Sequence, residues 1–253
     1  MERGEIPLRV LAVRRNAALG PEGLDRALTG LPRPERDRLL RYRRPEDRHR
    51  GVLAAWLARR ALAEEVGRPA EALDVRREPP GRPYLAGAPA WTGDFNVSHS
   101  GEWVVCALVR RGRVGVDVQE VRAVAPGVAR HCCSPEEAAA LGCLPPEERP
   151  GYLLALWTLK EAVLKAAGVG LAVSPALVGL DTDRVCGAEP VLRRAPPAVG
   201  DGWRLWRAVL GRGYELALCA DEELWDGLVA HLGHEHVLFG APGGAARGPG
   251  VQR

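Results

Sequence analysis

The sequence predicts an α+β fold of two similar halves, in each of which a long helix packs on a small antiparallel sheet. Two observations support this prediction. Apolar residues recur at helical spacing in two long segments, residues 46–66 and 147–167. Short segments with alternating apolar residues lie before and after each long helix, and Gly or Pro turns separate them. The length of 253 residues allows one large domain or two modest ones.

The expected strands are short and rich in Val and Leu, and those at residues 176–181, 203–210 and 214–220 carry alternating apolar residues. Such alternation is typical of a sheet with one face on a core. We expect these strands at residues 7–13, 94–97, 103–109, 114–118, 176–181, 203–210 and 214–220. Between the first long helix and the second strand, residues 78–89 are rich in Pro and Gly, and we expect a loop there.

Several helix boundaries carry recognisable signals. Gly67 follows the last apolar residue of the first long helix, where a glycine commonly ends a helix. Ser134 and Glu137 have the spacing of a capping box, which predicts that a short helix begins between them. Pro32 and Pro34 open an arginine-rich helical segment. The expected helices are therefore that segment and residues 46–66, 135–141, 147–167 and 222–232.

The order of elements divides the chain into three parts. The first part ends and the second begins within the expected strand at residues 114–118, and the third holds a helix and a tail. Because the tail from residue 240 onward is mostly Gly, Ala and Pro, we expect it to be disordered. The parts are residues 1–115, 116–220 and 221–253.

Composition limits the class of protein. The net charge is only +3, but arginines are concentrated in residues 33–50. That stretch fits either a phosphate-bearing partner or a solvated helix face. There is no run of 18 apolar residues and no apolar segment at the N-terminus, so we expect no membrane contact and a cytoplasmic location. The six cysteines lack CxxC spacing and are expected to be thiols.

Three segments contain residues that could carry out chemistry. Asp117 interrupts an apolar strand, and a buried carboxylate needs a partner or a metal. Glu161 and Lys165 lie four residues apart and share one face of the second long helix, either as an ordinary surface pair or at an active site. Two carboxylates from a strand and a helix would suit Mg²⁺. The third segment, FNVSHSG at residues 95–101, places His99 in a turn that it could simply cap.

Four motifs together resemble one enzyme family. GRPYL, FNVSHSG, VGVDVQ and LWTLKEAVLKAAGVGL occur in the order and at the spacing of the 4'-phosphopantetheinyl transferases of the surfactin-synthetase-activating (Sfp) type. The resemblance covers residues 31–181. It implies two α+β halves about a pseudo-twofold axis. It also implies transfer of the phosphopantetheine arm of coenzyme A to a serine hydroxyl of a carrier protein, with release of adenosine 3',5'-bisphosphate.

The resemblance also implies a role for each matching residue. Asp117 and Glu161 would hold Mg²⁺, with Mn²⁺ as the alternative ion, against the pyrophosphate of coenzyme A. Lys165 would neutralise charge on those phosphates, and Glu161 would accept the serine proton directly or through water. The 3'-phosphate would be bound by Arg50, Ser98 and His99. The adenine end would be bound by Gly81, Arg82 and Pro83. Arg36 and Arg38 would make further phosphate contacts.

One departure from the family pattern concerns the metal site. Many members have an acidic residue where this chain has Gln119. Either the amide oxygen of Gln119 or a water would then complete the metal site. This departure keeps a second function open, a transferase-like module that binds coenzyme A without transfer. A nucleic-acid-binding function of residues 33–50 is disfavoured, because Tyr42 is the one aromatic residue among the arginines.

The expected partners are apo acyl carrier or peptidyl carrier proteins, as in polyketide and nonribosomal peptide synthesis. They would dock near residues 120–145, and the enzyme would act as a monomer without binding nucleic acid. The three histidines at the end of the chain are expected to be exposed on the last helix, although a metal site is the alternative. They are His231, His234 and His236.

Overall fold

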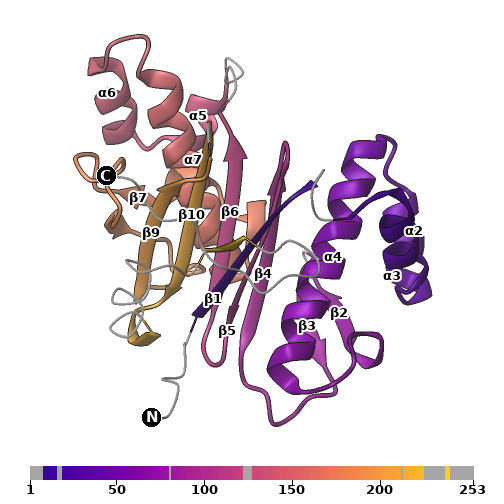
Figure 1. The fold of residues 1–253 in the computed structure, drawn as a ribbon. Coiled ribbons are helices and arrows are strands. Elements are labelled where there is room, and N and C mark those ends of the chain that lie inside the picture. The colour runs from indigo at the N-terminus through magenta and orange to yellow at the C-terminus, as the bar shows by residue number, and fades with distance from the viewer. Residues whose placement is uncertain are drawn as a thin grey trace.

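The computed structural model describes residues 8–15, 19–79, 81–121, 127–211, 213–224 and 237–239. The chain is an α+β protein in which strands lie at the centre and helices flank them on both sides (Figure 1). Within the described ranges, no helix has the length and apolar character needed to cross a membrane. The helices are α2 (Pro21–Thr29), α3 (Arg33–Leu40), α4 (Pro45–Val66), α5 (Val128–Cys132), α6 (Pro135–Cys143) and α7 (Arg149–Ala167).

Two antiparallel sheets form the centre of the fold. The first has the order β11-β1-β5-β4, in which only β11 runs parallel to its neighbour, and the second has the order β6-β10-β9. Their strands are β1 (Leu8–Arg14), β4 (Asp94–Ser100), β5 (Trp103–Val109), β6 (Val114–Glu120), β9 (Trp203–Val209), β10 (Tyr214–Asp221) and β11 (Val237–Phe239). Two smaller hairpins pair β2 (Asp74–Glu78) with β3 (Arg82–Ala86), and β7 (Gly179–Leu180) with β8 (Leu192–Arg194).

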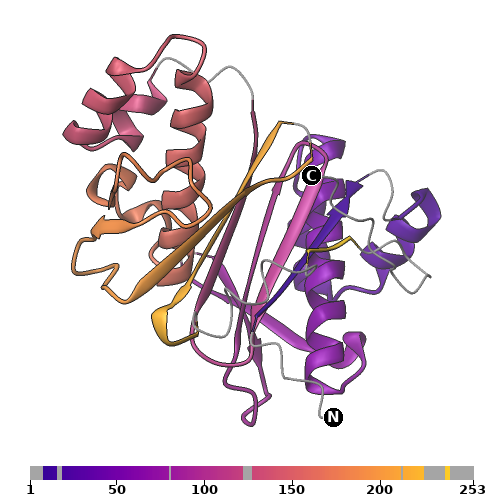
Figure 2. The ribbon, with the colours of Figure 1, turned by 60° about the vertical axis from the view of Figure 1, so that its left-hand side comes forward.

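The elements stack in four layers with three apolar cores between them. Figure 2 shows α4 on one side of the strands and α7 on the other. One core lies between the two sheets, one between the first sheet and α4, and one between the second sheet and α7. Strand β5 is buried along its whole length because Val105 faces one core and Cys106 the next. The same layering leaves Asp117 on the face of β6 that α7 covers.

A close approach of backbone brings α7 onto β6. A Cβ atom on Gly115 would lie 2.0 Å from the carbonyl oxygen of Ala162, so only glycine fits at this contact. The helix ends at Gly168, whose φ of 77° is in the left-handed region. These two glycines set the depth and the end of the helix that carries Glu161 and Lys165.

Side chains of β4 join the two sheets. Four backbone N–H groups of β6 each donate to a side chain of β4, in the same order along both strands. The contacts run from Val114 to Asp94, from Val116 to Asn96, from Val118 to Ser98 and from Glu120 to Ser100, at 2.9, 3.2, 3.3 and 3.0 Å. The polar residues of the FNVSHSG motif therefore hold the halves together at the edge where the site forms.

Most expected elements are confirmed to within a few residues. The expected loop at residues 78–89 is wrong, because β2 and β3 form a hairpin there and the GRPYL motif is mostly strand. The expected strand at residues 176–181 is reduced to a 3-10 turn, Pro175–Leu177, followed by β7. Of the expected last helix, the structure describes only a 3-10 turn at Glu222–Leu224. The expected tail and the three C-terminal histidines lie outside the described residues.

Candidate functional site

A cleft of about 380 Å³ lies between α4 and α7, and its floor includes parts of β4 and β6. Helix α4 lines it with small residues, so that the two helices leave room for a ligand. At Gly51 a Cβ atom would lie 2.7 Å from the side chain of Leu39, so no larger residue fits there without a shift. Helix α7 contributes three larger side chains, Trp157, Glu161 and Lys165.

Asp117 is the centre of the polar contacts in this cleft. Its side chain is only 2% exposed. One carboxylate oxygen accepts from Lys165 Nζ at 2.6 Å and from Ser98 Oγ at 2.7 Å, and the other accepts from Gln119 Nε2 at 2.9 Å. The buried carboxylate thus has the partners that the sequence argument required.

Lys165 forms its ion pair with Asp117 of β6 and not with Glu161 of its own helix. Its ammonium group donates to Asp117, to Ser98 Oγ at 3.1 Å and to the carbonyl oxygen of Val116 at 3.2 Å. These contacts use all three of its N–H donors. The described residues show no ion pair between Lys165 and Glu161, so the surface-pair interpretation of their spacing is wrong. A buried carboxylate on the facing strand is the stronger partner for the ammonium group.

Glu161 is left with an unused oxygen. Its Oε1 atom is buried and has no hydrogen-bond partner. Burial raises the pKa of the Glu161 carboxyl, and the nearby charge of Asp117 raises it further, while Lys165 lowers it. A buried carboxylate oxygen without a donor is an energetic cost in the free protein, and a cation or a proton donor from a ligand would remove that cost.

The fit of a divalent cation rests on this donor set. Within the described ranges, no group of three or more His, Cys, Asp and Glu residues could hold a metal ion. Mg²⁺, however, keeps several waters and needs only one or two carboxylates besides substrate phosphates. Of the carboxylates that line the cleft, Asp117 and Glu161 would be the ones to hold such an ion, Glu161 through its unpartnered oxygen. The amide nitrogen of Gln119 donates to Asp117. The role of Gln119 as a metal ligand stays a prediction.

The basic end of the cleft lies toward α3, β2 and the end of β4. Burial lowers the pKa of His99, and the positive charges of Arg50 and Lys165 lower it further. His99 is therefore neutral at pH 7 in a positive environment, where an anion would be stabilised. Arg50 donates to the carbonyl oxygen of Gly101 at 3.1 Å, pairs with Asp47 and is not among the residues that line the cleft.

Two arginines of the cleft were not predicted, Arg59, which pairs with Glu35 at 2.8 Å, and Arg77. Arg77 lines the cleft beside Arg38, and burial together with the charge of Arg38 lowers the pKa of the Arg77 guanidinium. Correct assignment of β2 as a strand would have identified Arg77. Side chains alternate along a strand, so Arg76 and Arg77 must face opposite sides, and only Arg77 lines the cleft.

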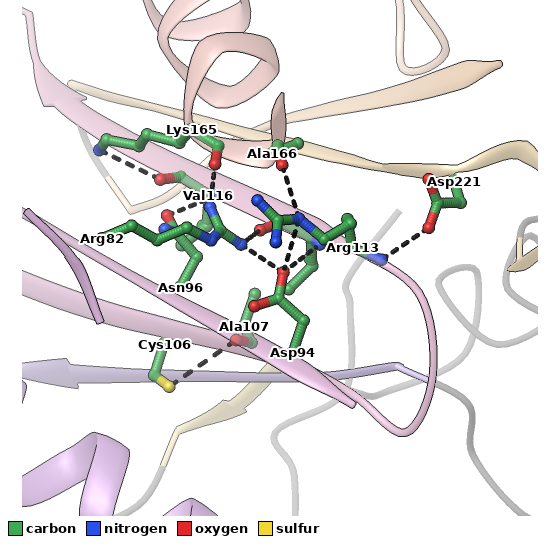
Figure 3. A network of polar contacts seen from close by, with 11 residues as sticks. Arg82, Asp94, Asn96, Cys106, Ala107, Arg113, Val116, Lys165, Ala166 and Asp221 are labelled. Atoms are coloured by element: carbon green, nitrogen blue, oxygen red, sulfur yellow. Dashed lines mark hydrogen bonds and ion pairs between the residues drawn. The ribbon is translucent and has the colours of Figure 1, made fainter. Parts of the chain in front are cut away.

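Several residues assigned to coenzyme A do not reach the cleft as expected. Pro83 lines it, but Gly81 and Arg82 do not. The guanidinium of Arg82 lies in a buried network with Asp94 and with the carbonyl oxygens of Val114 and Lys165 (Figure 3). Arg36 donates to the carbonyl oxygen of Thr29 at 3.3 Å, outside the cleft. Arg38, Ser98 and His99 are brought together with the Asp117 cluster.

Sequence comparisons match both halves of the chain to one superfamily. The family described as "4'-phosphopantetheinyl transferase superfamily" matches residues 113–219, and the one described as "4'-phosphopantetheinyl transferase, N-terminal" matches residues 20–110. A 4'-phosphopantetheinyl transferase of Bacillus subtilis is 28% identical over 66% of this chain and 73% of its own length. The transferase Sfp of Bacillus subtilis strain 168 is 25% identical with the same coverage. One from Bacillus pumilus is 34% identical over 52% of this chain and 55% of its own length.

Proposed function

Because the chain belongs to the 4'-phosphopantetheinyl transferase superfamily and resembles its Sfp-type enzymes, we propose that it transfers the phosphopantetheine arm of coenzyme A to an apo carrier protein. The acceptor is a serine hydroxyl, and the leaving product is adenosine 3',5'-bisphosphate. The observation that carries the proposal for this chain is the convergence of Asp117, Glu161 and Lys165 on one cleft from β6 and α7.

Asp117 and Glu161 would hold Mg²⁺, and Gln119 or a water would complete the site. When bound, the ion supplies positive charge to the pyrophosphate of coenzyme A and fixes its orientation. The carboxylates suit this role in different ways. Asp117 is already held in place by Ser98 and Lys165, whereas Glu161 has an oxygen without any partner.

Lys165 would neutralise the charge that develops on the phosphates as the arm is transferred. All of its donors are occupied in the free protein, so one must be released when substrate binds. Ser98 is the neutral side-chain acceptor of the set, and exchange of Ser98 for a phosphate oxygen costs less than loss of Asp117. The cluster therefore holds the ammonium group close to its position in the reaction.

Glu161 is the proposed acceptor of the serine proton. Its raised pKa makes the carboxylate a stronger base than an exposed glutamate, as general base catalysis requires. The hydroxyl oxygen then attacks the β-phosphorus in line, the bond to the bridging oxygen breaks, and adenosine 3',5'-bisphosphate leaves. The proton passes to Glu161 directly or through one water.

The 3'-phosphate would bind at the basic end, where Arg50 and Lys165 supply positive charge around the neutral His99. Arg38 and Arg77 line the same cleft and would contact the remaining phosphates. A guanidinium group can donate two parallel hydrogen bonds to the oxygens of one phosphate, which fixes the orientation of the ligand. The adenine end would then lie against the backbone near Pro83.

The proposed partners are acyl and peptidyl carrier proteins of polyketide and nonribosomal peptide synthesis, which a monomeric enzyme in the cytoplasm would modify. They would dock near residues 120–145, of which residues 122–126 lie outside the described part. Helices α5 and α6 belong to this region, and residues 131–133 at the end of α5 stand where the resembling family often has an aromatic residue. This difference would affect docking more than the chemistry.

The test is direct. The protein is mixed with coenzyme A, Mg²⁺ and each of several apo carrier proteins, and intact-mass spectrometry follows the carrier. A gain of one phosphopantetheine arm, lost with a chelator and with a carrier whose acceptor serine is alanine, supports the proposal. Tight binding of coenzyme A without transfer to any carrier would refute it and favour the non-catalytic module instead.

A further inference from the structure

The last turn of α7 is held by groups from outside the helix. The final carbonyl groups of a helix have no partner within it, and together they form the negative end of its dipole. Arg82 donates to the carbonyl oxygen of Lys165, and Arg113 Nε donates to that of Ala166 at 3.3 Å. Figure 3 shows both guanidinium groups between these carbonyls and Asp94. The turn that carries Lys165 is thus tied to the start of β3 and to the residue that precedes β6.

Asp94 completes the contact from β4. Its side chain is 10% exposed and pairs with the Arg82 side chain, which is 4% exposed. Arg82 also donates to the carbonyl oxygen of Val114 at 2.9 Å, and Asp94 accepts the N–H of Val114 at 2.9 Å. The Arg82 and Asp94 pair therefore binds both backbone groups of one residue of β6 as well as the end of α7. We call these two side chains the clamp.

The clamp and the Lys165 ammonium group use the same two strands. The ammonium group donates to Asp117, which lies three residues after Val114 on β6, and to Ser98, which lies four residues after Asp94 on β4. The backbone of Lys165 is fixed at one end of this short segment and its Nζ atom at the other. A shift of the helix end would therefore move the ammonium group relative to Asp117.

We propose that Arg82 and Asp94 position Lys165, and that Arg82 acts on the reaction through Lys165 and not by contact with coenzyme A. The kinetic part of this inference rests on the proposed function. The placement itself comes from the clamp contacts and from the absence of Arg82 from the residues that line the cleft. Arg82 is thus a positioning residue, unlike Arg77 of the same hairpin, which lines the cleft.

The composition of the chain offers a test that needs no turnover. The sequence has two lysines, and only Lys165 is followed by alanine. Protein labelled with carbonyl-¹³C lysine and ¹⁵N alanine therefore gives one signal in an HNCO spectrum, from the carbonyl that accepts from Arg82. We expect Arg82→Lys and Asp94→Asn to move this signal. A signal unmoved by both would overturn the inference.

The hairpin supplies a matched control. Arg76 and Asp74 also form an arginine to aspartate pair, at 2.7 Å, but their side chains are 62% and 50% exposed. Arg76→Lys and Asp74→Asn make the same chemical changes away from the cleft and from α7. Both should leave the carbonyl signal and the activity at wild-type values. A shift as large as that of the clamp variants would mean that any change in the hairpin disturbs α7.

Kinetics separate positioning from contact with substrate. We expect Arg82→Lys and Asp94→Asn each to lower kcat at least about tenfold while KM for coenzyme A changes by less than about twofold. The double variant should be no more than about twofold slower than the slower single variant, because the pair acts as a unit. A raised KM with normal kcat in Arg82→Lys, or a normal kcat in Asp94→Asn, would overturn the inference.

Failure of the inference and failure of the proposed function give different results. A wild-type protein that transfers nothing to any carrier removes the function, while the carbonyl signal still tests the clamp in that protein. Circular dichroism establishes that each variant is folded. If Arg82→Lys does not fold, Asp94→Asn decides, and an unmoved signal in it counts against the clamp.

Discussion

Replacement of Lys165 by methionine removes the cation that pairs with Asp117. The carboxylate is buried, and among the described residues the Ser98 hydroxyl and the Gln119 amide are the side-chain donors that remain. Removal of one partner from a buried ion pair costs about 3–5 kcal/mol. Lys165 is 25% exposed and two neutral donors remain, so we expect a loss of about 2–3 kcal/mol. For a chain of this size that corresponds to a fall in Tm of about 5–10 °C.

Thermal unfolding followed by circular dichroism at pH 7 measures this change. The double variant Lys165→Met with Asp117→Asn removes the unpaired charge at position 117 and should recover at least about 1 kcal/mol relative to Lys165→Met. Arg26→Met is the matched control, because its ion pair with Glu22 is exposed and should contribute less than about 0.5 kcal/mol. A Tm of Lys165→Met equal to that of the control, or additive losses in the double variant, would refute the reasoning.

Three further predictions concern single residues of the cleft. Glu161→Gln should abolish transfer yet raise Tm at pH 7, because the raised pKa means that folding disfavours the charged carboxylate. The gain should vanish as the pH falls below the ordinary value of 4.5, and a gain that persists at pH 3.5 contradicts the assignment. Gln119→Glu should lower the Mg²⁺ concentration for half-maximal activity severalfold, by about three- to tenfold, because it adds a carboxylate ligand; an unchanged titration argues against a role in the metal site. Bound anion should raise the lowered pKa of His99, so the Kd for adenosine 3',5'-bisphosphate measured by calorimetry should fall from pH 7.5 to pH 6, with a smaller change in His99→Gln; equal pH dependence in both proteins contradicts contact with the phosphate.

Periodicity was sufficient to predict the central layers of the fold. The apolar repeats of the two long helices, the alternation in β6 and β9 and the longer apolar runs of β5 and β10 reflect packing against a core on one or both faces of each element. The β2 and β3 hairpin was missed because Pro83 lies within β3, while Pro79 and Gly81 lie between the two strands. Among the described strands, β2 and β3 pair only with each other, so they lack the apolar pattern that identifies a buried strand.

The candidate site was predicted in its residue types but not in its contacts. Asp117 stood out because an acidic residue in an apolar strand needs a partner. The choice of Lys165 for Asp117 over Glu161 depends on how deeply α7 packs against β6, and Gly115 sets that depth. The burial of Arg82 could not be foreseen either, since its acceptors on β4, β6 and α7 come from three distant parts of the chain.

The central claim is that Asp117 and Glu161 form one phosphopantetheine-transfer site with Lys165. Single-turnover transfer to an apo carrier protein, followed by intact mass with coenzyme A and Mg²⁺ in excess, tests it most directly. The account predicts complete modification by the wild-type protein and rates reduced at least about a hundredfold in folded Asp117→Ala and Glu161→Ala. Transfer at the wild-type rate by either variant would contradict it.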